Sequence, residues 1–278
     1  MTAAAQDPID ITRAYYDSAD ADNFYFHIWG GEDIHVGIYE DGETDIARAS
    51  RKSIERMASR LPHLGEQTRV LDLGAGFGGA ARYLARTAGC HVTALNFSAT
   101  ENARSRALCE AAGLSARITI VEGSFEDIPA PAESFDVVWS QDALLHSGKK
   151  QTVVREAARV LRPGGDFIFT DPMESGKSER KDLQPVLDRI HLSSLGSFQT
   201  YAEAADAVGL CVLDLIDLTP NLVQHYALVR SELILKRNTL SGLVSESFID
   251  RMLIGLDHWV RAGKRGSLAW GILHFRRT

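Results

Sequence analysis

The sequence has few cysteines, no long apolar run and no block of like charge. Its three cysteines, Cys90, Cys109 and Cys211, are odd in number and form no CxxC pair. This spacing excludes a disulfide framework and favours small buried side chains in a reducing compartment. No stretch reaches the ~18 consecutive apolar residues of a membrane helix, and the start MTAAAQDPID lacks the basic and apolar parts of a signal peptide. We therefore expect a cytoplasmic protein without a membrane partner.

Charge is mixed along the chain, with 37 acidic and 30 basic residues and a formal net charge of -7. Such a balance repels phosphate, which argues against nucleic acid or an anionic membrane as a partner and leaves a small molecule. The chain is 45% hydrophobic over 278 residues, enough for a full core. It also lacks linkers rich in Gly, Ser or Pro and internal repeats, so we expect a single domain.

Apolar runs alternate with helical patterns between about residues 68 and 171. The runs are rich in Val, Ile, Leu and Phe with little alternation, which is typical of strands covered on both faces; they are residues 68–73, 91–96, 118–122, 135–140 and 166–171. Between them, helical patterns end at Gly89, Gly113 and the Arg162–Gly165 turn, and Ser98 with Glu101 forms a capping-box pattern. Strands that alternate with helices predict an α/β fold with a doubly wound, Rossmann-like parallel sheet.

The two flanks of this core have a different pattern. Residues 1–65 contain an aromatic cluster and then a helical stripe at 54–61. Residues 173–278 contain helical patterns near 183–190, 222–235 and 248–260, a second capping box from Thr200 to Glu203, and apolar runs at 211–218 and 267–275. We expect one domain (1–278) with an N-terminal lid (1–65), a cofactor-binding core (66–172) and substrate-side helices with the final strands (173–278).

A glycine-rich turn follows the first predicted strand in the stretch VLDLGAGFGG. Glycines at such a turn let the backbone approach a ligand closely. Gly74, Gly76 and Gly79 also match the dinucleotide pattern GxGxxG, so the loop alone leaves a nicotinamide cofactor open. Asp72, an acid inside an apolar strand, is costly unless it orders the loop or meets a cation. Its place suits a ligand that carries an ammonium and a sulfonium.

The ends of the next strands carry further candidates for ligand binding. Asn96 ends the second strand, where an acidic residue usually binds a ribose; an amide can both donate to and accept from hydroxyls. Ser124 and Phe125 follow the third strand, where they could provide a polar contact and an aromatic wall for an adenine; taken singly, each could equally be loop or core.

Several motifs resemble a known family in order and spacing. LDLGAGFGG, FDVVWSQD and LRPGG resemble the class I S-adenosylmethionine-dependent methyltransferases. More narrowly, FYFHIWGGEDIHVGIY (24–39), the Asn96 position, WSQDALLHS, TDPM, LDRIHL, the His225-Tyr226 pair and the C-terminal LAWGILHFRR resemble the sarcosine/dimethylglycine N-methyltransferases, which methylate glycine derivatives toward glycine betaine. The resemblance runs from about residue 15 to the C-terminus.

This resemblance implies a seven-stranded sheet whose last strand, 267–275, is antiparallel. It also implies S-adenosyl-L-methionine as cofactor, S-adenosyl-L-homocysteine as its product, and no metal. The candidate cofactor-binding residues are Tyr16, Asp72, Gly74, Ala75, Gly76, Asn96, Phe97, Ser124, Phe125 and Gln141.

Asp142 and His146 are the candidate catalytic residues. They lie four positions apart after the fourth predicted strand, at the edge where open α/β sheets bind ligands. On a helical turn they would share a face, and Asp142 could orient His146 as a base for the amine proton. The pair is similar to one in phosphoethanolamine methyltransferases. The alternative is that both side chains only cap the segment.

A small carboxylated amine requires a cation-binding wall and an anion-binding group. Aromatic faces attract a methylated ammonium, and an arginine binds a carboxylate with two parallel hydrogen bonds. The candidate substrate-binding residues are Tyr25, Trp29, Met173, Arg189, His225 and Tyr226. Each aromatic could instead belong to the core, and Arg189 could be one partner of a surface ion pair.

The sequence therefore predicts a methyltransferase that converts sarcosine, dimethylglycine or both toward glycine betaine. One alternative keeps the fold but changes the acceptor to another small amine or a lipid. The other is a nicotinamide-dependent oxidoreductase or a non-catalytic nucleotide-binding module.

Overall fold

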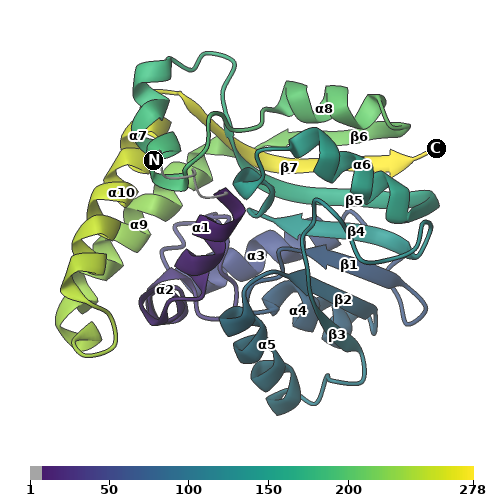
Figure 1. The fold of residues 1–278 in the computed structure, drawn as a ribbon, viewed down its shortest axis with the longest axis horizontal. Helices are drawn as coiled ribbons and strands as arrows, with labels where there is room; N and C mark the ends of the chain where they lie inside the picture. The colour runs from purple at the N-terminus through teal and green to yellow at the C-terminus, as the bar shows by residue number, and fades with distance from the viewer. Residues whose placement is uncertain (1–7) are drawn as a thin grey trace, which may run out of the picture.

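The computed structural model describes residues 8–278 and confirms the predicted doubly wound sheet. Its strands are β1 (Arg69–Leu73), β2 (His91–Asn96), β3 (Ile118–Glu122), β4 (Phe135–Gln141), β5 (Leu161–Glu174), β6 (Leu210–Asp217) and β7 (Leu268–Arg277). They form one seven-stranded sheet in the order β3-β2-β1-β4-β5-β7-β6. The neighbours from β3 to β5 pair in parallel, and β7 runs antiparallel to both β5 and β6, as predicted (Figure 1).

Strand β5 is longer than the apolar run 166–171 at both ends. It begins at Leu161, which pairs with Phe135 before the register shifts, so the predicted turn at Arg162–Gly165 lies inside the strand. It continues to Glu174 because β7 pairs with it along its whole second half, with Trp270 opposite Pro172. A partner strand about 100 residues away therefore sets its length.

Helices cover both faces of the sheet. Their bounds are α3 (Ile46–Ala58), α4 (Gly79–Thr87), α5 (Ala99–Ala111), α6 (Lys150–Val160) and α8 (Phe198–Asp206). Apolar side chains of α3, α4 and α5 pack with β1 and β2 in one core, whereas those of α6 and α8 pack with β5 in another. Both faces are thus buried, which accounts for the near-continuous apolar runs of the strands.

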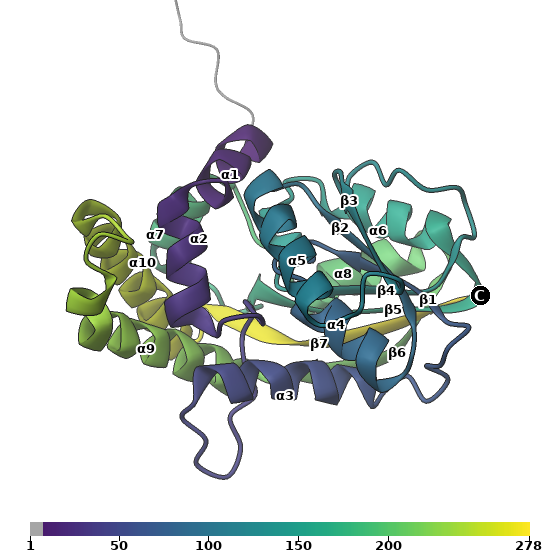
Figure 2. The same ribbon diagram turned by 90° about the horizontal axis from the view of Figure 1, so that it is seen from below.

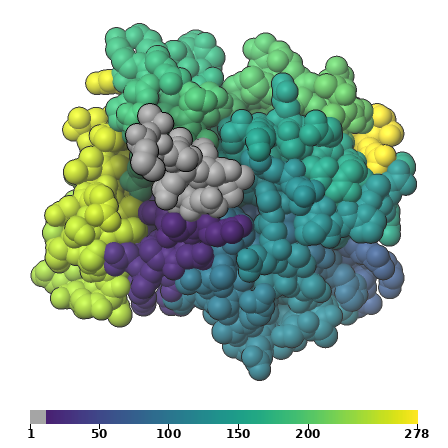
Figure 3. Space-filling model, viewed as in Figure 1, coloured from purple at the N-terminus to yellow at the C-terminus, as the bar shows by residue number. Residues whose placement is uncertain are grey.

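A third core joins the two flanks of the chain at the carboxyl ends of the parallel strands. Its elements are α1 (Pro8–Tyr16), α2 (Ala19–Phe24), the π-helical turn Tyr25–Trp29, α7 (Arg180–Ile190), α9 (Thr219–Lys236) and α10 (Glu246–Lys264). Figures 1 and 2 show α1 and α2 between the helices α7, α9 and α10 and the sheet. In the space-filling view they lie between the yellow-green C-terminal helices and the teal core (Figure 3). None of the helices described here has both the length and the apolar character of a membrane span.

Three local predictions need correction. Ser98 does cap α5, but the Glu101 side chain turns to Asn96 instead of completing a capping box. Helix α8 begins after Ser197, whose side chain forms a capping box with Thr200, so Thr200 is the third residue of the helix and not the cap. Cys211 is exposed on the edge strand β6, unlike the buried Cys90 and Cys109.

Candidate functional site

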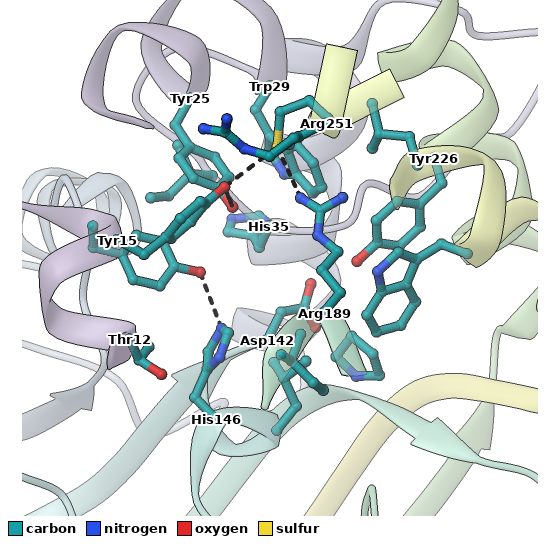
Figure 4. A pocket seen from close by; sticks show the side chains of 18 of the residues that line it. Thr12, Tyr15, Tyr25, Trp29, His35, Asp142, His146, Arg189, Tyr226 and Arg251 are labelled. Carbon is teal, nitrogen blue, oxygen red and sulfur yellow. Dashed lines mark hydrogen bonds between the residues drawn. The ribbon is translucent and has the colours of Figure 1, made fainter. Parts of the chain in front are cut away.

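Two adjoining cavities open at the carboxyl ends of the parallel strands, beneath the third core. The larger has a volume of about 590 Å³ and the smaller about 70 Å³. Both are lined by Tyr16, Ile34, His35, Asp142 and His146, so these residues mark the place where the cavities meet. Figure 4 shows the larger one. A ligand that spans the junction could bring two reacting groups together here.

The glycine-rich turn forms one wall of the smaller cavity. Gly74 and Gly76 have φ of +69° and +52°, which only glycine adopts without strain. A Cβ atom on Gly74 would lie 2.3 Å from the Ala143 Cβ, and one on Gly79 would lie 1.9 Å from an Asp33 oxygen. The backbone N–H groups of Gly74 and Ala75 donate to the Leu95 carbonyl. Glycine is therefore required here by backbone angle and by space.

Asp72 is buried beneath this turn. Its Oδ2 has no hydrogen-bond partner within residues 8–278, and its side chain lines the smaller cavity. Burial raises the pKa of the Asp72 carboxyl to about 7. An unpaired buried carboxylate is costly in free energy, and a cationic ligand group would relieve that cost.

Asn96 does not act alone at the end of β2. Its Nδ2 donates to Glu101 Oε2 at 2.8 Å, and both side chains line the smaller cavity. Burial raises the pKa of the Glu101 carboxyl to about 7. The acid expected at the strand end is thus supplied five residues later, from the first turn of α5. The sequence pattern predicts Glu101 only as part of a helix cap, and its place in the wall of a ligand cavity has no local signal in the sequence.

The structure brings nearly all the candidate cofactor-binding residues together. Those that line the smaller cavity are Tyr16, Asp72, Gly74, Ala75, Gly76, Asn96, Phe97, Phe125 and Gln141. Ser124 is not one of the lining residues, and its Oγ accepts from the Glu126 N–H, so it orders the loop that carries Phe125.

Asp142 and His146 both line the cavity junction, but they are not placed as a helical pair. Asp142 has φ of +53°, and only a short 3-10 turn, Leu144–His146, follows it. The Asp142 carboxylate accepts from the Val36 N–H at 2.6 Å and from the Trp270 Nε1–H at 2.7 Å. The predicted Asp-to-His orientation is therefore wrong: Asp142 is held by two other segments of the chain.

His146 instead pairs with the N-terminal segment. Its Nε2 lies 3.0 Å from the Tyr16 hydroxyl at the end of α1. Burial lowers the pKa of the His146 imidazole to about 4. The ring is therefore neutral at pH 7 and has one nitrogen free of a proton. Leu145, the residue before it, donates its N–H to Asp171 at 2.8 Å, which ties the turn to β5.

Aromatic side chains and one arginine line the larger cavity. Tyr226 of α9 stacks on Trp259 of α10 with ring centroids 4.8 Å apart, and Tyr25 and Trp29 line the cavity from the π-helical turn. Arg189, in the last turn of α7, points inward beside Tyr226 (Figure 4). Its Nη2 contacts Met252 Sδ at 2.8 Å, and its buried Nη1 has no partner in the described chain. This guanidinium can therefore bind an anion in an aromatic enclosure.

Two candidate substrate-binding residues lie elsewhere. Met173 is fully buried in the core of α6 and α8, because side chains alternate along β5 and its neighbour Pro172 takes the cavity side. His225 lies behind the cavity wall: its Nδ1 accepts from the Gly37 N–H at 3.1 Å and lies 2.8 Å from the Tyr39 hydroxyl. Neither lines a cavity. His225 instead holds the segment that carries Val36 to Tyr39.

Sequence reasoning missed several residues of the site. No sequence pattern links Trp270 to Asp142, and Trp259, Met252 and Phe248 line the larger cavity from α10. Asp171 is buried, and besides Leu145 it accepts from the Tyr201 hydroxyl at 2.7 Å. An acid within an apolar run is the signal that singles out Asp72, and the same signal could have identified Asp171.

Comparisons with known proteins agree with this fold and identify its family. Residues 71–169 match the family described as Methyltransferase domain. The chain is 49% identical, over 97% of its length, to a sarcosine/dimethylglycine N-methyltransferase of Halorhodospira halochloris, of which the match covers 96%. It is 50% identical over 96% of its length to a glycine/sarcosine/dimethylglycine N-methyltransferase of Actinopolyspora halophila, but it spans only 47% of that protein. A crystal structure from Galdieria sulphuraria, assigned as a sarcosine dimethylglycine methyltransferase, superposes with a TM-score of 0.89 and 43% identity over 95% of this chain and 99% of that chain.

Proposed function

Because the chain belongs to the sarcosine/dimethylglycine N-methyltransferase family, we propose that it transfers a methyl group from S-adenosylmethionine to the amine of sarcosine, dimethylglycine or both, toward glycine betaine. The observation that carries the proposal is the junction of the two cavities at Asp142 and His146. One cavity offers a glycine-rich turn over an unpaired acid, and the other offers aromatic walls around an unpaired guanidinium.

The smaller cavity has the donor and acceptor groups that S-adenosylmethionine requires, and the cofactor supplies an electrophilic methyl group when it is bound. The unpartnered Asp72 Oδ2 suits the ammonium of its amino acid part. Asn96 and Glu101 suit the ribose hydroxyls, and Phe97 and Phe125 offer aromatic faces to the adenine.

The residues at the junction can handle the proton of the amine. An N-methyl amino acid is mostly protonated at pH 7, whereas attack on a methyl group requires the free lone pair. His146, whose pKa is lowered, can accept that proton directly or through the Tyr16 hydroxyl, which lies 3.0 Å from its Nε2. The Asp142 carboxylate, held by Val36 and Trp270, can stabilise the positive charge on the amine.

The larger cavity suits the remainder of such an acceptor. The unpaired Nη1 of Arg189 can bind the substrate carboxylate, and Tyr25, Trp29 and Tyr226 can surround the methylated ammonium.

Contacts from α1 and α2 support the proposal that residues 1–65 form a lid over this site. Asp17 accepts from the Ser98 Oγ–H at 2.7 Å at the start of α5, and Asp22 forms an ion pair with Arg104. On the opposite side, Asp20 accepts from the Ser245 N–H at 2.7 Å before α10. These polar contacts hold the segment to both walls, in addition to the apolar packing of Phe24 in the third core.

Mass spectrometry of methyl transfer tests the function. The protein is incubated with S-adenosylmethionine and, separately, with glycine, sarcosine, dimethylglycine or dimethylethanolamine. We expect a mass gain of one methyl group on dimethylglycine and one or two on sarcosine, and none on dimethylethanolamine, which lacks the carboxylate. No gain on any glycine derivative, with S-adenosylhomocysteine bound normally, would contradict the proposed acceptor but keep the cofactor.

A further inference from the structure

His35 is a buried side chain of the site to which no role has been assigned. It lies in the segment between the π-helical turn and α3, is 6% exposed, and lines both cavities. Its Nε2 has no hydrogen-bond partner in the part of the chain that the structure describes. In Figure 4 its ring faces the larger cavity from the wall behind Tyr25. A buried ring nitrogen without a partner in the wall of a cavity indicates contact with a ligand group.

A chain of hydrogen bonds favours one of the two nitrogens of His35 as the site of the proton. It begins at Trp139 Nε1, which can only donate and lies 3.1 Å from Gln141 Oε1. The Gln141 amide nitrogen therefore faces Ser53 and donates to its Oγ at 2.9 Å. The Ser53 hydroxyl hydrogen is then free to point at His35 Nδ1, which is 3.1 Å away, whereas the Val36 carbonyl oxygen, which would require a proton on Nδ1, is 3.3 Å away. The shorter Ser53 contact favours the neutral ring in which Nδ1 accepts and Nε2 carries the proton.

The donor role of His35 Nε2 does not depend on the charge of the ring. In the protonated ring both nitrogens carry hydrogen, so Nε2 donates in either state. The two nearby groups do not satisfy it. His225 accepts the Gly37 N–H at its Nδ1, so its own Nε2 carries a proton. The Asp142 oxygens accept from Val36 and Trp270, and neither forms a hydrogen bond with His35 Nε2 in the described structure.

We propose that His35 Nε2–H donates a hydrogen bond to a ligand carboxylate at the junction of the two cavities. The inference rests on the proposed function, because S-adenosylmethionine and dimethylglycine each carry one carboxylate. Asp72 can pair with the ammonium of S-adenosylmethionine, and Arg189 can pair with the carboxylate of dimethylglycine. His35 provides a further hydrogen bond, from a neutral donor to a carboxylate. The bond also lets Ser53 and Gln141 set the orientation of the ligand through the imidazole.

Binding measurements on His35→Leu distinguish the two sources of the carboxylate. If it belongs to the cofactor, calorimetry shows S-adenosylhomocysteine bound about 10- to 100-fold more weakly, while 5′-methylthioadenosine, which lacks the carboxylate, binds as it does to the wild type. If it belongs to the acceptor, the KM for dimethylglycine rises by a similar factor and binding of S-adenosylhomocysteine is unchanged. His35→Gln, which keeps an N–H donor on a chain of similar length, restores most of either loss.

Two serines of α3 provide a matched test of the hydrogen-bond chain. Ser53 and Ser50 are both fully buried and both contact His35, but Ser50 donates only to its backbone carbonyl, at 2.9 Å. We expect Ser53→Ala to let the proton move to Nδ1 and to reproduce part of the His35→Leu loss, whereas Ser50→Ala keeps the wild-type affinity. Nitrogen-15 NMR at pH 8 reports the same change, since the Nε2–H tautomer of the wild type is lost only in Ser53→Ala.

The inference is wrong if His35→Leu folds and leaves both the S-adenosylhomocysteine affinity and the dimethylglycine KM unchanged. It is also wrong if the wild-type ring carries its proton on Nδ1. A wild-type protein that binds no S-adenosylhomocysteine and methylates no glycine derivative contradicts the proposed function instead.

Discussion

Replacing Arg189 by methionine separates substrate binding from stability. The Arg189 guanidinium lines the larger cavity with one nitrogen in contact with Met252 and the other, Nη1, without a partner in the described structure. Its desolvation therefore costs stability that no ion pair offsets. Methionine keeps the apolar stem and removes the charge. We expect Arg189→Met to unfold at the same temperature as the wild type or a higher one, and to bind dimethylglycine poorly.

The size of the binding loss follows from the hydrogen bonds available. At least one N–H···O bond from Nη1 to the substrate carboxylate is lost, and a hydrogen bond to a charged group contributes ~1.5–3 kcal/mol. At about 1.4 kcal/mol per factor of ten, the KM for dimethylglycine should rise roughly 10- to 150-fold. Affinity for S-adenosylhomocysteine should stay within about twofold, since Arg189 lines only the larger cavity.

Arg251→Met is the matched control for this variant. Arg251 also lines the larger cavity, but it is exposed and lies over the Phe248 ring at 5.9 Å. Solvent screens an exposed charge, so its KM should change less than threefold. A lower melting temperature for Arg189→Met with an unchanged KM would refute the reasoning, because Arg189 would then be a structural residue. Equal KM changes in both variants would indicate a general effect of positive charge at the cavity mouth.

Three further changes test other parts of the site. Asp72→Asn should melt ~2–5 °C above the wild type at pH 8, and calorimetry should show weaker binding of S-adenosylhomocysteine. The pKa of Asp72 is raised to about 7 in the folded state, so ionisation of this carboxyl costs stability only as pH rises above its unfolded value of about 4. The difference in unfolding free energy between Asp72→Asn and the wild type should therefore grow from about pH 4 to pH 7 and stay constant above pH 7. A difference that grows on acidification contradicts this assignment. Tyr16→Phe removes the 3.0 Å contact to His146 and should lower kcat about 3- to 10-fold, measured with saturating dimethylglycine; an unchanged kcat would remove Tyr16 from proton transfer. Tyr201→Phe removes one of the donors to the buried Asp171 and should lower the unfolding free energy by ~1–3 kcal/mol in urea titrations, whereas an unaltered value would show that Leu145 alone satisfies that carboxylate.

The central sheet could be predicted because the burial of each strand is visible in the strand's own residues. Strands buried on both faces require apolar runs, and the helices between them end at Gly89 and Gly113, which adopt positive φ. The extra length of β5 carries no such signal. Residues beyond Asp171 are in the sheet because Trp270 and its neighbours pair with them, so the strand end depends on a segment far along the chain.

The same limit applies to the transfer site. Asp142 and His146 could be predicted to lie at a ligand-binding edge because residue type and position at the end of β4 restrict the chemistry, and both line the cavity junction. The predicted orientation of His146 by Asp142 is wrong, because a spacing of four residues predicts a shared helical face only if the segment is helical. Asp142 instead has a left-handed backbone conformation, and its carboxylate accepts hydrogen bonds from Val36 and Trp270. Both residues lie more than 100 positions away, one before Asp142 and one after it. No periodicity in the sequence reports such a contact.

Arg189 and Gly255 illustrate how the larger cavity depends on contacts between helices. Gly255 lies inside α10, where glycine costs ~1 kcal/mol relative to alanine, and no turn or positive φ explains it. A Cβ atom at this position would lie 1.3 Å from Arg189 Nη1. The missing side chain therefore makes room for the guanidinium that α7 directs into the cavity. In the sequence, Arg189 and Gly255 are 66 positions apart and nothing links them. The packing of α7 against α10 brings them together, so that the glycine is required for the position of the arginine. That position is the one from which we propose that Arg189 binds the carboxylate of the amine substrate.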